Sequence, residues 1–216
     1  MNINRIERII YLVTPNFILT RILHRFPKFK FFKQTSKTQT PISFDLWYNQ
    51  KIKGHCSRAY WPVHPSSKVT GVENIYCGIE TSPGISHGNY IQAIGKIYIG
   101  DYTQIAPNVG IISANHELED NRKHIIKEVH IGKYCWIGMG AIILPGTHLG
   151  EYTIVAAGSI VTKSFEEGYC VIGGNPARIL KKLDRNKCVL HKSDYEYNGY
   201  IPSEDFEAYR KKHLNV

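Results

Sequence analysis

An aliphatic residue recurs at every sixth position from residue 131 to residue 161, and this register constrains the fold more than any other feature. The run consists of Ile131, Ile137, Ile143, Leu149, Val155 and Val161. A period of six fits neither an α-helix, which repeats every ~3.6 residues, nor a two-faced strand, which repeats every two. It fits a three-sided prism, in which three hexads make one coil and the aliphatic side chains point inward.

The positions around these aliphatic residues support a stack of such coils. Small or compact residues follow at a fixed offset, at Cys135, Ala141, Thr147, Thr153 and Ser159. The same register appears upstream at Ile99, Ile105 and Ile111, with weaker copies from Val63, so coiling is expected to begin near residue 60. Strands of an ordinary β-sandwich are joined by turns of variable length, which would not keep this register.

The sequence therefore predicts an all-β chain with short helical appendages at its two ends. Residues 60–183 are expected to form a parallel β-helix of hexapeptide repeats, with a loop at 117–130. Residues 1–59 are expected to form a basic N-terminal helical arm. Residues 184–216 are expected to form a C-terminal tail, with a short helix from Ser203 to about Leu214.

The net charge of +9 is concentrated in the N-terminal arm. Residues 1–40 hold eight Lys and Arg and one Glu, which gives +7 and leaves +2 for the rest of the chain. A basic arm on a nearly neutral body indicates a local anionic partner, such as a membrane surface, and not nucleic acid. Apolar residues at helical spacing after Pro15 predict a basic amphipathic helix, which either rests on a membrane or caps the open end of the prism.

The cysteines and the apolar segments indicate the compartment. Five cysteines, an odd number, form no CxxC pair and follow no signal peptide, so we expect free thiols and neither a disulfide framework nor a zinc site. The apolar run from Ile9 to Val13 ends at Thr14, well short of the roughly 20 residues that a spanning helix needs. We expect a cytoplasmic protein that does not cross the membrane, with peripheral membrane contact through residues 1–40 as an open alternative.

Three stretches of this chain resemble the hexapeptide-repeat acyltransferases. They are IGDYTQIAPNV (99–109), ANHE (114–117) and the run from IGKYCWIG (131–138) to GGNPARIL (173–180). The family includes galactoside and maltose O-acetyltransferases, serine acetyltransferase and bacterial polysaccharide O-acetyltransferases, and the likeness covers about residues 60–183. The resemblance implies a left-handed coil, a homotrimer with sites between subunits, acetyl-CoA as co-substrate and no required metal.

The hexads stop at Asn115-His116-Glu117, so we expect a loop to leave the prism there. Loops on a rigid scaffold are where catalytic groups concentrate, and in the resembling enzymes the corresponding histidine is the catalytic base. A thioester is already activated, so a base that removes the acceptor's proton can suffice. We predict His116 as this base, with its ring oriented either by Glu117 or by a backbone carbonyl.

The resemblance also implies a coenzyme site, and a break in the hexad register suggests residues for the acceptor. Residues that match the family's coenzyme contacts are Trp136, Met139, Ala157, Gly158, Thr162, Lys163 and Arg178. Lys163 and Arg178 could meet the coenzyme phosphates, although Arg178 could instead cap the last coil. The segment GISHGNYIQA (84–93) departs from the hexads, and it supplies His87, Asn89 and Gln92 as candidate acceptor-binding residues.

We therefore predict an acetyl-CoA-dependent O-acetyltransferase that acts on a sugar hydroxyl, such as that of a bacterial surface polysaccharide or its precursor. An amine acceptor, such as an aminosugar nucleotide, would use the same base and remains an alternative. A carbonic-anhydrase-like β-helix is another, and it would need His87, His116 and His124 around zinc. A non-catalytic scaffold is the third alternative.

Overall fold

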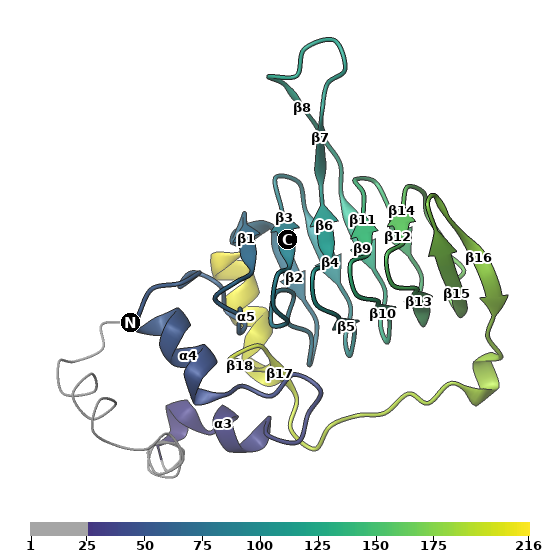
Figure 1. The fold of residues 1–216 in the computed structure, drawn as a ribbon. Coiled ribbons are helices and arrows are strands. Elements are labelled where there is room, and N and C mark those ends of the chain that lie inside the picture. The colour runs from purple at the N-terminus through teal and green to yellow at the C-terminus, as the bar shows by residue number, and fades with distance from the viewer. Residues whose placement is uncertain (1–25) are drawn as a thin grey trace.

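The computed structural model describes residues 26–216, and its body is a prism of three sheets whose strands pair in parallel, except for the last strand, β16 (Ala177–Lys182) (Figure 1). Side A holds β1 (Lys68–Thr70), β3 (Tyr90–Gln92), β6 (Gly110–Ile112), β11 (Ile142–Ile143) and β14 (Ile160–Val161). Side B holds β2 (Ile75–Cys77), β4 (Ile97–Ile99), β9 (Val129–Ile131) and β12 (His148–Leu149). Side C holds β5 (Gln104–Ile105), β10 (Trp136–Ile137), β13 (Thr153–Val155), β15 (Cys170–Gly174) and β16.

The chain visits sides A, B and C in turn, so each circuit is one coil. Strands of neighbouring coils pair in register, and on side A Ile91 pairs with Ile111 and Ile111 with Ile143. These three side chains are fully buried in the main core. The inward aliphatic column that the hexads predict is therefore confirmed, and the fold is an all-β parallel β-helix.

The predicted loop is a β-hairpin that projects from the prism (Figure 1). It consists of β7 (Ala114–His116) and β8 (His124–Ile126), which pair antiparallel. The chain returns to side B at β9. The hairpin therefore leaves the stack at the edge between sides A and B, in the middle of the coils.

The described part of the N-terminal arm packs at one end of the prism. It contains η1 (Pro27–Phe29), α3 (Phe31–Gln34) and α4 (Phe44–Lys51). Its buried side chains form a separate aromatic cluster of Phe29, Phe31, Phe32, Ile42, Phe44 and Trp47. The fully buried Gln50 ties α4 to the first coil, since its Nε2 donates to Trp61 O at 2.8 Å and its Oε1 accepts from Val63 N at 3.1 Å.

Residues 26–59 thus pack against the first coil. Most of the predicted amphipathic helix lies in residues 1–25, outside the described residues. No helix within the range 26–216 is long and apolar enough to span a membrane. All five cysteines, which lie in this range, are free thiols.

The C-terminal tail runs back along the prism after the β15–β16 hairpin. It contains η3 (Arg185–Lys187), β17 (Tyr197–Asn198), β18 (Ile201–Pro202) and α5 (Ser203–His213). The predicted helix is present, and its buried Phe206 packs on Tyr60, with ring centroids 5.3 Å apart. A short helical turn, η2 (Val72–Asn74), lies between the first two strands.

Stacked tyrosines line the edge between sides B and C, a feature that we did not predict. One tyrosine from each successive coil contributes, and neighbouring ring centroids lie 5.2, 5.7 and 5.6 Å apart along Tyr102, Tyr134, Tyr152 and Tyr169. All four have a positive φ, between 46° and 57°, a conformation that is uncommon for residues other than glycine. We call this set the tyrosine ladder.

The tyrosine ladder holds the tail. Tyr134 Oη donates to His191 O at 3.0 Å, and Tyr152 Oη donates to Val189 O at 2.7 Å. The guanidinium of Arg185 lies 4.5 Å from the centre of the Tyr169 ring. The tail is therefore attached along the coils before α5 packs at the N-terminal end of the prism.

Candidate active site

His116 lies on β7 of the hairpin with its side chain exposed. Its Nδ1 lies 2.5 Å from the backbone carbonyl of Asn121. A carbonyl can only accept, so Nδ1 carries the hydrogen and, in the neutral ring, Nε2 carries the lone pair. The hairpin thus fixes the tautomer that can accept a proton through Nε2.

Glu117 does not orient this ring. Its Oε2 lies 3.7 Å from Lys123 Nζ, and Lys123 also lies 3.6 Å from Asp120 Oδ2. Arg122 donates to the same aspartate, and these hydrogen bonds hold the pKa of the Asp120 carboxyl below its usual value. Of the two predicted ways to orient His116, the structure therefore has the backbone carbonyl.

The foot of the hairpin is fixed between coils. Ser113 is fully buried, and its Oγ lies 2.8 Å from Gln92 O and accepts from Gly95 N at 2.9 Å. Lys127 N donates to Ser113 O at 2.9 Å on the returning strand. A Cβ on Gly95 would lie 2.6 Å from Lys127 O, so glycine permits this close approach. The position of His116 therefore rests on backbone packing at the foot.

The coenzyme candidates lie along other parts of the prism. Met139 follows β10, and Ala157 and Gly158 follow β13, so these three share the edge between sides C and A. Gly158 N donates to Met139 O at 2.8 Å, and no atom would lie within 4 Å of a Cβ on Gly158. Trp136 and Met139 are 56% and 57% exposed. The C–A edge is thus an open strip of small residues beside two large apolar side chains.

The three basic or hydroxyl-bearing candidates are distributed differently. Thr162 and Lys163 follow β14 and lie on the A–B edge, the edge that carries the hairpin. Lys163 Nζ lies 5.7 Å from the centre of the Phe165 ring. Arg178 is exposed on β16, at the end of side C. A single chain therefore places His116 on one edge and Met139, Ala157 and Gly158 on another.

The acceptor candidates also separate. His87 lies on the C–A edge, where its ring is 6.1 Å from His64. Asn89 is 1% exposed, and its Nδ2 donates to Ala106 O at 2.8 Å, so it lies inside the prism, where an acceptor would not reach it. Gln92 is partly buried at the A–B edge, and its buried Oε1 has no partner among the described residues. Of the three, Gln92 alone shares an edge with His116.

The zinc alternative requires His87 beside the hairpin, but His87 lies on the C–A edge. The rings of His116 and His124 are 4.6 Å apart. Across residues 26–216, no three His, Cys, Asp or Glu side chains come together to hold a metal ion. From the sequence, His124 is named only as a zinc ligand and the orienting carbonyl is left unassigned, because the hairpin conformation that brings His124 and the Asn121 carbonyl to His116 is not visible in the sequence.

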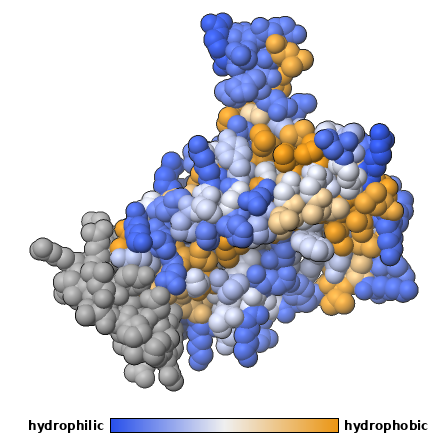
Figure 2. All heavy atoms as spheres, viewed as in Figure 1, coloured by the Kyte–Doolittle hydropathy of each residue, from blue (hydrophilic) through white to orange (hydrophobic). Residues whose placement is uncertain are grey.

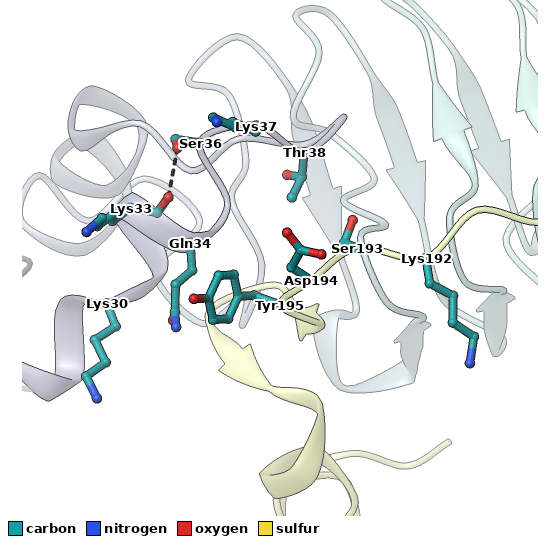
Figure 3. A pocket seen from close by; sticks show the side chains of 10 residues that line it. All are labelled: Lys30, Lys33, Gln34, Ser36, Lys37, Thr38, Lys192, Ser193, Asp194 and Tyr195. Carbon is teal, nitrogen blue, oxygen red and sulfur yellow. Dashed lines mark hydrogen bonds between the residues drawn. The ribbon is translucent and has the colours of Figure 1, made fainter.

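A cavity of about 640 Å³ lies at the α3 end of the molecule (Figure 3). It is lined by Lys30, Lys33, Gln34, Ser36, Lys37, Thr38, Lys192, Ser193, Asp194 and Tyr195. Lys30 lies at the lower left of the view and Lys192 at the lower right, and Lys37 lies near the top, so these ammonium groups are spread around the cavity. The charged side chains thus do not converge on one ligand position, and we place the candidate active site at the hairpin.

Comparison with known proteins agrees with this fold. Residues 128–163 match the family described as Bacterial transferase hexapeptide (six repeats). A putative acetyltransferase of Dictyostelium discoideum is 47% identical over 94 residues, which cover 42% of this chain and 49% of that protein. Nodulation protein L of Rhizobium meliloti is 43% identical over 58 residues, which cover 25% of this chain and 32% of that protein. The matches thus span a third to a half of these relatives.

Solved structures resemble a larger part of the chain. A maltose O-acetyltransferase from Clostridium difficile superposes with a TM-score of 0.54 at 25% identity, over 77% of this chain and 89% of that one. A galactoside acetyltransferase in complex with coenzyme A superposes with a TM-score of 0.55 at 22% identity, over 92% of this chain and 100% of that one. The repeat, the sheet topology and these likenesses show that the fold is a left-handed parallel β-helix of hexapeptide repeats, the fold of these acetyltransferases.

Proposed function

We propose that the protein transfers an acetyl group from acetyl-CoA to a hydroxyl of a sugar, as part of a bacterial surface polysaccharide or its precursor, with His116 as general base. One observation carries this proposal. The Asn121 carbonyl accepts a hydrogen bond from Nδ1 of His116, so Nε2 carries the free lone pair of the neutral ring. The histidine lies on a hairpin that projects from a prism of hexapeptide repeats. The maltose O-acetyltransferase of the same fold supports a sugar hydroxyl as the acceptor.

The chemistry needs one proton carrier. His116 Nε2 accepts the proton of the acceptor hydroxyl as the oxygen attacks the thioester carbonyl carbon. The bond between the carbonyl carbon and sulfur then breaks, and the imidazolium returns the proton to the coenzyme thiolate. The backbone N–H of Met139 donates to no other described residue, so it is a candidate donor to the oxyanion that forms between these two steps.

A homotrimer would complete the site. One chain holds His116 on its A–B edge and the exposed strip of Met139, Ala157 and Gly158 on its C–A edge. In a three-fold ring each subunit presents one surface to one neighbour and a different surface to the other. The A–B edge of one subunit would then face the C–A edge of the next, with the coenzyme between them. Lys163 and Arg178 would meet its phosphates.

The test measures release of coenzyme A from acetyl-CoA in the presence of sugars, glycans and amino sugars. We expect acceptor-dependent release by the wild type and a loss of about 100- to 10,000-fold in His116→Ala, with acetyl-CoA affinity unchanged by calorimetry. His148→Ala removes an exposed histidine on side B and is the matched control. Absence of acetyl-CoA binding by the wild type would refute the proposal, and transfer to amines alone would change the acceptor.

A further inference from the structure

His124 lies directly opposite His116 in the hairpin. The two residues pair across β7 and β8, and their ring centroids are 4.6 Å apart with an interplanar angle of 40°. Residues directly opposite in an antiparallel pair project from the same face. Whatever approaches Nε2 of His116 therefore also comes within reach of the His124 ring.

The ring of His124 is available for binding. It is exposed, and within the part of the chain that the structure describes neither of its nitrogens has a hydrogen-bond partner. His116 is already oriented by the Asn121 carbonyl, so it does not need His124 for that purpose. A neutral imidazole offers one donor and one acceptor, which suits a hydroxyl group as a partner.

The same face continues toward the prism with an apolar pair. Ala114 pairs with Ile126, two positions along from the histidines, so these side chains share the histidine face. Ile126 is 57% exposed, and Figure 2 shows apolar side chains gathered where the hairpin meets the prism. The two imidazoles could form hydrogen bonds with the hydroxyls of a sugar, and the exposed aliphatic side chain could pack against the C–H face of its ring.

We propose that His124 is an acceptor-binding residue that selects acceptors with a second hydroxyl beside the one that is acetylated. His116 deprotonates the first hydroxyl, and His124 forms a hydrogen bond with its neighbour. Two hydroxyls on adjacent ring carbons lie closer together than the two rings do, and each reaches its own imidazole across one hydrogen bond. This inference rests on the proposed function, and it adds the chemical class of the acceptor, a vicinal diol.

The experiment measures kcat/KM for two acceptors. One is a vicinal diol that the wild type acetylates, and the other is its analogue that lacks only the second hydroxyl. We expect the wild type to favour the diol about tenfold or more in kcat/KM, because a site built to bind a hydroxyl rejects the analogue without it. His124→Ala should raise KM for the diol about tenfold, leave KM for the analogue and for acetyl-CoA unchanged, and leave kcat within about twofold. His124→Gln keeps a donor and an acceptor and should restore part of the preference.

Ile125→Ala is the matched control, because Ile125 lies on the same strand but pairs with Asn115 on the opposite face. It should keep the full preference for the diol. A preference that is unchanged in a folded His124→Ala, or a fall in kcat at constant KM, would overturn the inference while leaving the proposed function in place. A wild type that binds no acetyl-CoA and acetylates neither compound would overturn both, so the two failures are distinguishable.

Discussion

His116 Nδ1 donates its hydrogen to the backbone carbonyl of Asn121 at 2.5 Å, across the turn of the same hairpin. The group that orients the candidate base is therefore part of the main chain. A carbonyl can only accept a hydrogen bond, so the hairpin conformation holds the neutral ring in the tautomer that leaves Nε2 free.

Substitution of Glu117 tests this assignment. We expect Glu117→Gln to keep acetyl transfer within about threefold of the wild type, because the carboxylate faces Lys123 and not the His116 ring. Steady-state kinetics with a saturating acceptor measure the change. A fall comparable to that of His116→Ala would show that Glu117 contacts the base during turnover.

The foot of the hairpin gives a second prediction. Gly95→Ala would place a methyl group 2.6 Å from Lys127 O, so the hairpin must shift. Small displacements of a catalytic group are costly, and we expect kcat/KM to fall about tenfold or more while acetyl-CoA binding persists. Gly110→Ala is the control, since its Cβ would meet Ile142 at an ordinary 3.6 Å. Equal activity of the two variants would contradict the prediction.

Mixed trimers test whether one site draws on two edges. We expect His116→Ala and Ala157→Trp to be inactive alone, because one lacks the proposed base and the other obstructs the C–A edge that is proposed to bind the coenzyme. When the two variants are unfolded together and reassembled, about a quarter of the sites should combine two intact edges. Recovered activity near that fraction supports a site between subunits, whereas none after confirmed mixing supports a site within one chain.

The tyrosine ladder predicts a stability change that is independent of catalysis. Tyr152→Phe keeps the stacked ring but removes the hydrogen bond to Val189 O, and we expect a loss of about 1 kcal/mol in the free energy of unfolding. Limited proteolysis should cut faster near residue 189. Tyr169→Phe removes a hydroxyl that contacts Glu151 instead of the tail, and it should leave that cleavage rate unchanged.

Lys51 predicts a pH dependence of stability. Burial lowers its pKa from the usual 10.5 to about 8, although its Nζ donates to Ser57 O and Ala59 O. Between pH 8 and pH 10.5 the unfolded chain binds more protons at this residue than the folded chain, so its contribution to stability rises with pH. The free energy of unfolding of the wild type, relative to Lys51→Met, should therefore be higher at pH 9.5 than at pH 7.5.

Taking the difference between wild type and variant removes the contributions of groups that do not interact with Lys51, but not that of Cys56, whose thiol interacts electrostatically with Lys51. Burial raises the pKa of the Cys170 thiol and of the Tyr209 hydroxyl. The folded chain therefore keeps these protons to a higher pH than the unfolded chain does, and both groups lower the free energy of unfolding as the pH rises above their ordinary pKa values. These contributions are common to both proteins. A difference that stays constant across this pH range would mean that Lys51 keeps an ordinary pKa in the folded state.

The fold could be predicted because its signal repeats. Each inward position of the prism is filled by the same class of residue, so Ile131 and Ile143 carry the same information as Ile99 and Ile111. The hairpin was legible as an interruption of that register. Its pairing was not, since the partner of His116 depends on where the turn falls between residues 117 and 123.

The remaining features depend on geometry that the sequence does not express. Which candidates share an edge follows from counting coils, and the hairpin inserted between β6 and β9 upsets that count. The same insertion hides the tyrosine ladder, because Tyr134 and Tyr152 are three hexads apart while Tyr102 and Tyr134 are not. Asn89 was predicted to bind the acceptor, but its side chain is buried at an inward position of the prism, where small side chains normally lie.

The path of the tail changes how the protein as a whole should unfold. Coils of a repeat protein contact only their neighbours, so the end coils of a simple stack can open one at a time. Here the segment that leaves the last coil is bonded to Tyr152 and Tyr134 in turn and ends as a helix packed on Tyr60 near the first coil. Opening either end therefore requires release of the other, which joins a linear array of coils into one cooperative unit.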